Sequence, residues 1–194
     1  MMDCSVRDAA RHAPILVGMT RSDGPSGARL AVVVMGVSGC GKSTVAAGIA
    51  ERLGLHFIDG DGLHPEANVA RMRAGIPLED ADRWPWLDRI GACLADGERW
   101  PQGLAVACSA LRRIYRDRLR AAAPGVRFVF LDGAPDVIAG RMAQRSGHYM
   151  PPTLLASQLR TLERPGADEH DVQHVAIDAP AVTVIEHSVL SLRR

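Results

Sequence analysis

The chain has 194 residues, of which 47% are hydrophobic and 23% are charged, with 23 basic side chains against 22 acidic ones. This composition describes one globular domain with a full core and no long-range field for nucleic acid or an anionic membrane. The apolar runs are far shorter than a membrane span, and the four cysteines have neither CxxC nor zinc-ligand spacing. We therefore expect a cytoplasmic protein without a transmembrane segment that recognises its partners at a local site.

The N-terminal part of the chain divides into an extension and the start of a domain. Residues 1–28 mix Asp and Arg with turn-forming residues and lack the apolar core of a signal peptide. We expect a flexible extension over residues 1–28 and a single domain over residues 29–194. The Val-rich run Leu30–Met35 ends at a glycine and indicates a buried parallel strand. Apolar residues then recur every four positions over Lys42–Leu53, which predicts a helix.

Short apolar runs and periodic stretches alternate along the rest of the chain. The runs predict strands at His56–Ile58, Leu104–Ala107, Arg127–Leu131 and His174–Ile177. The periodic stretches predict helices near Pro65–Ala74, Trp86–Ala95, Leu111–Ala122, Pro135–Ala143 and Pro152–Leu162. This alternation predicts a three-layer α/β fold, in which helices cover both faces of a mainly parallel five-stranded sheet.

A glycine-rich motif of the form GxxxxGK[ST] lies between the first expected strand and the first expected helix. Its glycines allow backbone N–H groups to turn inward around phosphate oxygens at a helix N-terminus. Lys42 would then reach the β- and γ-phosphates, and Ser43 would offer its hydroxyl to Mg²⁺. The alternative is a glycine turn with a chance Gly-Lys pair. The motif predicts that a nucleoside triphosphate binds to Gly36, Val37, Ser38, Gly39, Cys40, Gly41, Lys42, Ser43 and Thr44.

Lysine usage narrows the class of nucleotide-binding protein. Of the 23 basic residues 22 are arginine, and Lys42 is the only lysine. A lysine is a compact point charge that the planar fork of arginine does not replace, which agrees with a phosphate-binding role for Lys42. The guanine-binding motif of regulatory GTPases needs a lysine of its own. The sequence therefore excludes a GTPase of that kind.

Two carboxylates follow the second expected strand, in the sequence Asp59-Gly60-Asp61-Gly62. This position is the carboxyl edge of the sheet, where doubly wound folds bind their ligands. One residue separates the two carboxylates, so that one could face Mg²⁺ and the other the acceptor. We expect Asp59 to face Mg²⁺, and Asp61 to orient an acceptor hydroxyl and accept its proton. The alternative is that these residues form a solvated turn.

Further motifs follow the phosphate loop in a fixed order. They are Asp59-Gly60-Asp61, Leu63-His64-Pro65, Asn68, Arg71-Met72, Gly75, Pro77-Leu78, Asp80, Asp82-Arg83, Pro85-Trp86-Leu87, Cys108-Ser109-Ala110-Leu111-Arg112, Tyr115-Arg116-Asp117, Gly147-His148-Tyr149-Met150, Gln158 and Thr161-Leu162-Glu163. With this order and spacing, the chain from about residue 30 onward resembles the gluconate kinases, small P-loop kinases related in fold to shikimate and nucleotide kinases. The resemblance implies ATP-dependent phosphorylation of D-gluconate to 6-phospho-D-gluconate, use of Mg²⁺, a mobile lid and a homodimer.

A sugar acid presents one carboxylate and a row of hydroxyls, so its pocket needs a fixed cation and several short polar side chains. The candidates for the cation are Arg71, Arg83 and Arg112. The candidates for the hydroxyl contacts are Asp61, His64 and Asn68. The alternatives are that the arginines lie on solvated helix faces and that His64 caps a turn.

A lid is expected around residues 141–150. Arg141 and Arg145 are four residues apart, which would place them on one helix face just before a glycine-bearing loop that contains His148. Such a lid would exclude water and bring guanidinium groups to the transferring phosphoryl group, and His148 would contact the substrate. The alternative is an ordinary helix end.

Two departures from the family pattern limit what the resemblance implies. Arg112 stands where family members often carry lysine, which leaves the preference among sugar acids open. The strand Leu104–Ala107 ends without a carboxylate, so the metal role of Asp59 depends on its position and on the resemblance.

The alternative functions are a kinase for another small acid, such as shikimate or idonate, or a non-catalytic ATP-binding regulatory module. Nucleic acid is not expected, because Asp117 interrupts the arginines of residues 112–120.

Overall fold

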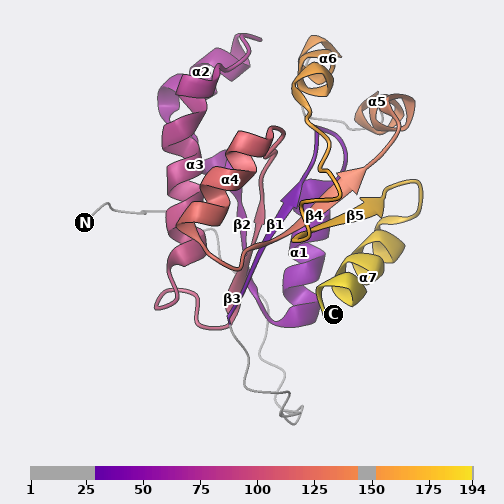
Figure 1. The fold of residues 1–194 in the computed structure, drawn as a ribbon. Coiled ribbons are helices and arrows are strands. Elements are labelled where there is room, and N and C mark those ends of the chain that lie inside the picture. Colours follow the sequence, from indigo (N-terminus) through magenta and orange to yellow (C-terminus); the bar gives the residue numbers. More distant parts are fainter. Residues whose placement is uncertain (1–28, 144–151, 194) are drawn as a thin grey trace, which may run out of the picture.

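A computed structural model describes residues 29–143 and 152–193 of the chain. Its strands form one parallel sheet in the order β2-β3-β1-β4-β5 (Figure 1). The strands are β1 (Leu30–Met35), β2 (His56–Asp59), β3 (Gly103–Ala107), β4 (Arg127–Asp132) and β5 (Val172–Ala176). The predicted five-stranded parallel sheet is confirmed.

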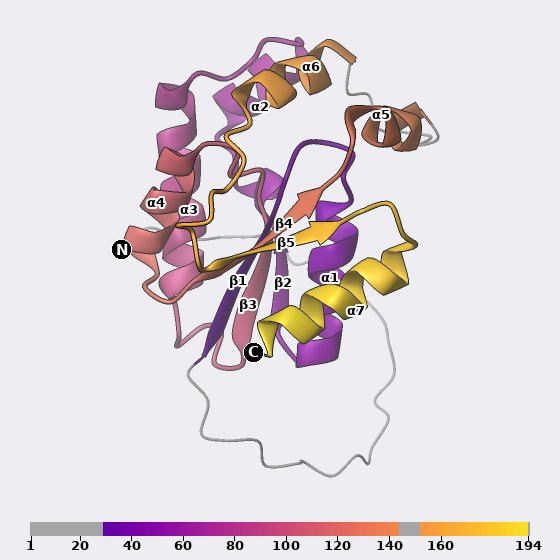
Figure 2. The same ribbon diagram turned by 45° about the vertical axis from the view of Figure 1, so that its right-hand side comes forward.

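Helices cover both faces of the sheet, which confirms the predicted three-layer α/β fold (Figures 1 and 2). They are α1 (Lys42–Leu53), the 3₁₀ helix η1 (Gly60–Leu63), α2 (Glu66–Arg73), α3 (Asp80–Ala95), α4 (Arg113–Ala122), α5 (Pro135–Ala143), α6 (Pro152–Thr161) and α7 (Ala181–Leu192). One face packs against α1 and α7, and the opposite face packs against α3 and α4. Both views place α2, α5 and α6 together at one end of the molecule.

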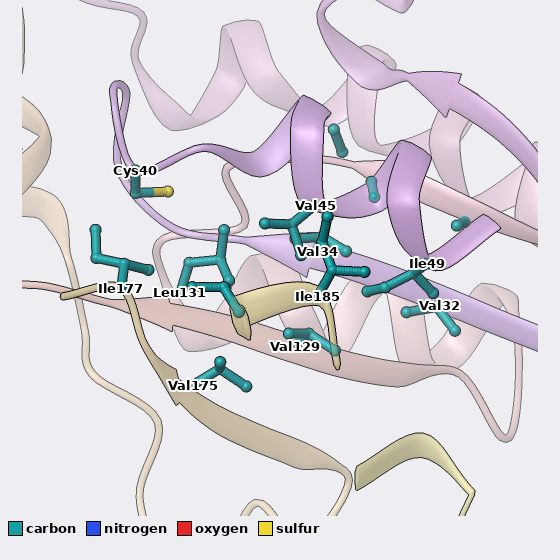
Figure 3. Packing of buried hydrophobic residues seen from close by; sticks show 14 of the residues in the cluster. Val32, Val34, Cys40, Val45, Ile49, Val129, Leu131, Val175, Ile177 and Ile185 are labelled. Atoms are coloured by element: carbon teal, nitrogen blue, oxygen red, sulfur yellow. The ribbon is translucent and has the colours of Figure 1, made fainter. Parts of the chain in front are cut away.

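The alternation of side chains along β1 divides the apolar core between the two faces. Val32 and Val34 point to the side of α1 and α7, where they join a cluster that includes Ile185 (Figure 3). Val33 and Met35 point to the side of α3 and α4. These four side chains of β1 are fully buried. The central strand is therefore held from both sides, and the loop that follows it starts from a rigid support.

Helix α7 was not expected from the sequence. Its β-branched residues favour strands, so the local sequence gives only a weak indication of a helix. Packing on α1 decides the conformation: a Cβ atom added to Gly48 would lie 2.5 Å from the Cδ1 atom of Ile185. The absence of a side chain at Gly48 thus lets the two helices approach closely.

Helix α3 begins at Asp80, six residues before the expected start at Trp86. Pro85 lies inside the helix. A capping box stabilises the first turn, because the Glu79 N–H donates to Asp82 Oδ2 at 2.8 Å and the Glu79 side chain accepts from the Asp82 backbone. The helix therefore starts early enough to place Arg83 and Asp80 in its first turn and a half.

The arginines of α4 are paired with carboxylates. The pairs are Arg113 with Asp168, Arg116 with Glu169, Arg118 with Asp88, and Arg120 with Asp171. Arg116 and Glu169 meet at 2.6 Å, and their side chains are only 1% and 2% exposed. The positive charge of this helix is thus balanced within the fold.

Among the described residues, no helix is both long enough and apolar enough to cross a membrane.

Candidate active site

The phosphate loop joins β1 to α1 at the carboxyl edge of the sheet. Gly36 and Gly39 have φ angles of +141° and +86°, a region that residues with side chains rarely adopt. At Gly39 a Cβ atom would also lie 2.5 Å from the Cγ atom of Met142, on α5. Lys42 Nζ donates to the Val37 carbonyl at 3.1 Å. The Lys42 side chain therefore folds back onto the loop that precedes α1.

Two oxygen ligands meet beside this loop. Ser43 Oγ donates to Asp59 Oδ2 at 2.7 Å, and Asp59 Oδ1 accepts from the Asp61 N–H at 3.1 Å. A hydroxyl and a carboxylate are oxygen donors of the kind that Mg²⁺ prefers. The donor set of Ser43 and Asp59 therefore fits a magnesium ion next to the phosphate loop.

The chain bends sharply between Asp59 and Asp61. Residues Gly60–Leu63 form η1, so the two carboxylates do not continue one extended strand. Gly60 makes the bend possible, since a Cβ atom there would lie 2.4 Å from the Ala107 carbonyl oxygen. Trp86 Nε1, on α3, donates to the Gly60 carbonyl at 2.7 Å, and this hydrogen bond stabilises the position of the bend relative to α3. Asp61 is thus held in the first turn of η1, exposed at the edge of the sheet.

Residues from three elements converge near Cys108, just after β3. Burial, with a smaller contribution from the charge of Asp61, raises the pKa of the Cys108 thiol to about 12, while a backbone hydrogen bond at Ala110 and the charges of Lys42 and Arg83 act to lower it. The lysine of the phosphate loop, the carboxylate of η1 and an arginine of α3 therefore all lie within electrostatic range of this thiol. The Ser109 carbonyl accepts from the Gly36 N–H at 3.3 Å, which joins the segment after β3 to the phosphate loop. This arrangement can bring a phosphate donor and an acceptor hydroxyl together.

Comparisons with known proteins agree with this arrangement. Residues 32–165 match the family described as the AAA domain. The chain is 51% identical to a gluconokinase of Gluconobacter oxydans over 71% of this chain and 78% of that protein. It is 42% identical to the thermosensitive gluconokinase of Escherichia coli over 84% of this chain and 88% of that protein. The chain belongs to the gluconokinase family.

A solved structure supports the assignment to the gluconokinase family. A gluconokinase from Sinorhizobium meliloti is 48% identical, with a TM-score of 0.79 over 85% of this chain and 92% of that one. The resemblance stated from the sequence is confirmed, and with it the expectation that the chain is a kinase.

His64 and Asn68, two of the expected substrate contacts, both lie against α3. The His64 ring stacks on Trp86 at 4.2 Å, with 11° between the ring planes. Burial, followed by the charges of Arg83 and Arg89, lowers the pKa of His64 to about 4, so the ring is neutral at pH 7. Asn68 is buried, and its Nδ2 donates to the Asp82 carbonyl at 2.7 Å. Asn68 therefore fixes α2 to the start of α3.

The candidate cations Arg71 and Arg112 have carboxylate partners. Arg112 donates to Asp80 and, from Nε at 3.0 Å, to Glu163. Arg71 makes a longer contact of 3.5 Å to Asp82. The charges of these two arginines are therefore at least partly balanced inside the protein.

Arg83 differs from the other two candidate cations. Among residues 29–143 and 152–193 it forms no ion pair; its Nη2 donates to the Leu78 carbonyl at 3.2 Å, and its guanidinium lies over the Tyr115 ring. The Nε atoms of Arg83 and of Arg71 are both buried without a hydrogen-bond partner in that part of the chain. Arg83 thus combines an unused donor with a guanidinium that has no ion-pair partner among the described residues.

The lid residues are only partly described. Arg141 donates to the carbonyls of Ile177 and, at 3.2 Å, Ala179. Arg145 and His148 lie outside the described residues, so their expected places in a lid stay predictions. The described part of α5 ends at Ala143.

Two features of the site were not expected from the sequence. The first is a cavity of about 310 Å³ beside the phosphate loop, lined by Gly39–Gly41, Thr44, Val45, Arg141, residues 179–181 and Val184. The second is a contact between α6 and the loop, in which Gln158 Oε1 accepts from the Ser38 N–H at 2.6 Å. The sequence carries no local signal for this cavity, because α7, whose first turn forms part of the cavity wall, has a strand-like composition.

Proposed function

We propose that this protein transfers the γ-phosphoryl group of ATP to the primary hydroxyl of D-gluconate and forms 6-phospho-D-gluconate. The observation that carries the proposal is the 51% and 42% identity to gluconokinases over most of their lengths. The site supports it with a phosphate loop, a pair of oxygen ligands and a guanidinium without an ion-pair partner among the described residues, all at one edge of the sheet.

The proposed nucleotide site combines the loop and the adjoining cavity. The backbone N–H groups of residues 36–44 and Lys42 would hold the phosphates. The cavity beside Gly39–Gly41, with its apolar residues from the start of α7, would hold the base. Arg141 lines this cavity and would lie near the bound nucleotide.

Ser43 and Asp59 are proposed to hold Mg²⁺. When bound, the ion neutralises charge that develops on the phosphate oxygens during transfer. Asp59 is fixed for this task by two hydrogen bonds, from the Ser43 hydroxyl and from the Asp61 N–H.

The acceptor is proposed to lie between η1 and α3. Arg83 would pair with the carboxylate of gluconate, because Arg83 has no carboxylate partner among the described residues, whereas Arg112 has two. Asp61 would orient the primary hydroxyl and accept its proton as the hydroxyl oxygen attacks the γ-phosphorus and ADP leaves. The neutral His64 ring would offer a hydrogen bond to a further hydroxyl.

The test is ADP release from the purified protein with Mg-ATP and, in separate reactions, gluconate, idonate, shikimate, glucose and nucleoside monophosphates. We expect turnover that depends on gluconate. Turnover with a different acceptor would support phosphoryl transfer but would show that the substrate is not gluconate. ATP binding without turnover in any reaction would favour a regulatory module instead.

Assembly and location complete the proposal. A homodimer and a cytoplasmic location are what the family resemblance and the composition predict. Sedimentation of the full chain tests the first of these, and fractionation of cells tests the second.

A further inference from the structure

A chain of contacts joins the acceptor side of the site to the segment that follows α6. Arg112 lies at the N-terminus of α4, and its guanidinium contacts two carboxylates from elsewhere in the chain. Asp80 is the first residue of α3, the helix that carries Arg83. Glu163 lies just after the end of α6 at Thr161. One guanidinium therefore connects the acceptor helix to the α6 segment.

Both ends of this connection are fixed by further hydrogen bonds. Tyr115 donates from its hydroxyl to Asp80 Oδ1 at 2.5 Å. Glu163 Oε2 accepts from the Arg113 N–H at 2.7 Å, and the Glu163 N–H donates to the Leu111 carbonyl at 2.9 Å. The two carboxylates are thus held in place independently of Arg112.

The same α6 segment also touches the phosphate loop. Gln158, five residues before Glu163, accepts the Ser38 N–H at 2.6 Å. Residues 158–163 therefore contact the phosphate loop directly and reach α3 through Arg112. A change in the distance between α3 and α6 would alter the alignment of an acceptor held on α3 with a donor held in the loop.

We propose that Asp80, Arg112 and Glu163 act as positioning residues that set the distance between the acceptor helix and the phosphate loop. This inference rests on the proposed function. It gives Arg112 a different task from binding the substrate carboxylate. Phosphoryl transfer needs donor and acceptor atoms in line, and a misplacement of about 1 Å can cost roughly 100-fold in rate. The group should therefore govern kcat more than the KM for gluconate.

Stability alone does not explain this group. The side chains of Arg112, Asp80 and Glu163 are 33%, 40% and 46% exposed. Ion pairs with such exposure contribute little to the free energy of unfolding, because water and salt screen them. Variants of these residues are consequently expected to fold.

The experiment compares Arg112→Gln, Glu163→Gln and the double variant with the wild-type chain. Arg113→Gln is the matched control, because Arg113 lies on the same helix and pairs with the exposed Asp168. We expect each single variant to lower kcat by about 10-fold or more, with the KM for gluconate changed by less than about 3-fold. The double variant should match the slower single variant, since both changes break one connection. The control should retain wild-type kinetics.

Two kinetic results would overturn the inference. The first is a KM for gluconate raised about 10-fold by Arg112→Gln with kcat unchanged in Glu163→Gln, which would make Arg112 a substrate contact. The second is additive losses in the double variant. Hydrogen exchange provides a readout that does not depend on the acceptor: Glu163→Gln should speed exchange at residues 80–83. Unchanged exchange there contradicts the connection, whereas absence of gluconate turnover in the wild-type chain contradicts the proposed function instead.

Discussion

Ser43 and Asp59 are sixteen residues apart in the sequence, and the hydroxyl of the first donates to the carboxylate of the second at 2.7 Å. The two residues come from α1 and from the end of β2, while β3 lies between β1 and β2 in the sheet. Since β3 ends at Ala107 without a carboxylate, in the proposed metal site Asp59 would supply the acidic oxygen from the next strand. The proposed metal site thus uses a residue one strand further from the phosphate loop than the end of β3.

Replacing Asp59 by asparagine should remove this acidic ligand with little change in shape. We expect Asp59→Asn to lower kcat by roughly 100-fold or more, because less charge is neutralised in the transition state. The measurement is the initial rate as a function of Mg²⁺ concentration, in which the variant should need more Mg²⁺ for half-maximal rate. Asp132→Asn is the control, since Asp132 also ends a strand but pairs with Arg164. Equal effects of both substitutions would contradict the metal role of Asp59.

Arg83 should determine affinity for the acid group of the substrate. A charge-assisted hydrogen bond to a carboxylate contributes about 1.5–3 kcal/mol, so Arg83→Gln should raise the KM for gluconate by roughly 10- to 100-fold. The KM for ATP should change little. Arg73→Gln is the control, because Arg73 is exposed on α2. Steady-state kinetics with both substrates varied would reject this role for Arg83 if gluconate affinity were kept.

The sequence and the structure differ most where long-range packing decides the outcome. The phosphate loop was predictable because its glycine spacing is local, and β1, β3 and β4 were predictable because each contains a continuous apolar run. Arg112 could not be assigned to a carboxylate from the sequence, since its partners lie 32 and 51 residues away. Helix α7 could not be predicted either, because its packing against Gly48 outweighs its strand-like composition.

His64 should make the stability of the fold depend on pH. Its pKa is lowered from 6.5 to about 4 in the folded state, so between these values the unfolded chain binds a proton that the folded chain does not. Stability should therefore fall as the pH falls from about 6.5 to about 4. His64→Gln should lack this part of the loss, so its melting temperature relative to the wild-type chain should improve towards low pH.

A series of melting curves across this range measures the effect. His187→Gln is the control, because His187 is exposed on α7. A difference between His64→Gln and the wild-type chain that stays constant from pH 7.5 to pH 4.5 would contradict the assignment.

The buried pair of Arg116 and Glu169 should contribute strongly to folding. Removing one partner of a buried pair leaves the other charge uncompensated and typically costs about 3–5 kcal/mol. We expect Glu169→Gln to lower the free energy of unfolding by this order, measured by urea denaturation. Asp88→Asn breaks an exposed pair with Arg118 and should cost less than about 1 kcal/mol. Similar losses in the two variants would show that burial of the Arg116 pair does not set its contribution.

The most direct test of the central claim is the structure of the product made from Mg-ATP and gluconate, read by phosphorus NMR. Gluconate has one primary hydroxyl, and a phosphate ester there is coupled to two neighbouring protons, which gives a triplet. We predict this triplet for the wild-type chain and less than about a tenth of its rate of formation for Asp61→Asn, the variant that lacks the proton acceptor. A doublet, which marks a secondary hydroxyl, or no phosphorylated sugar acid at all, would contradict the account.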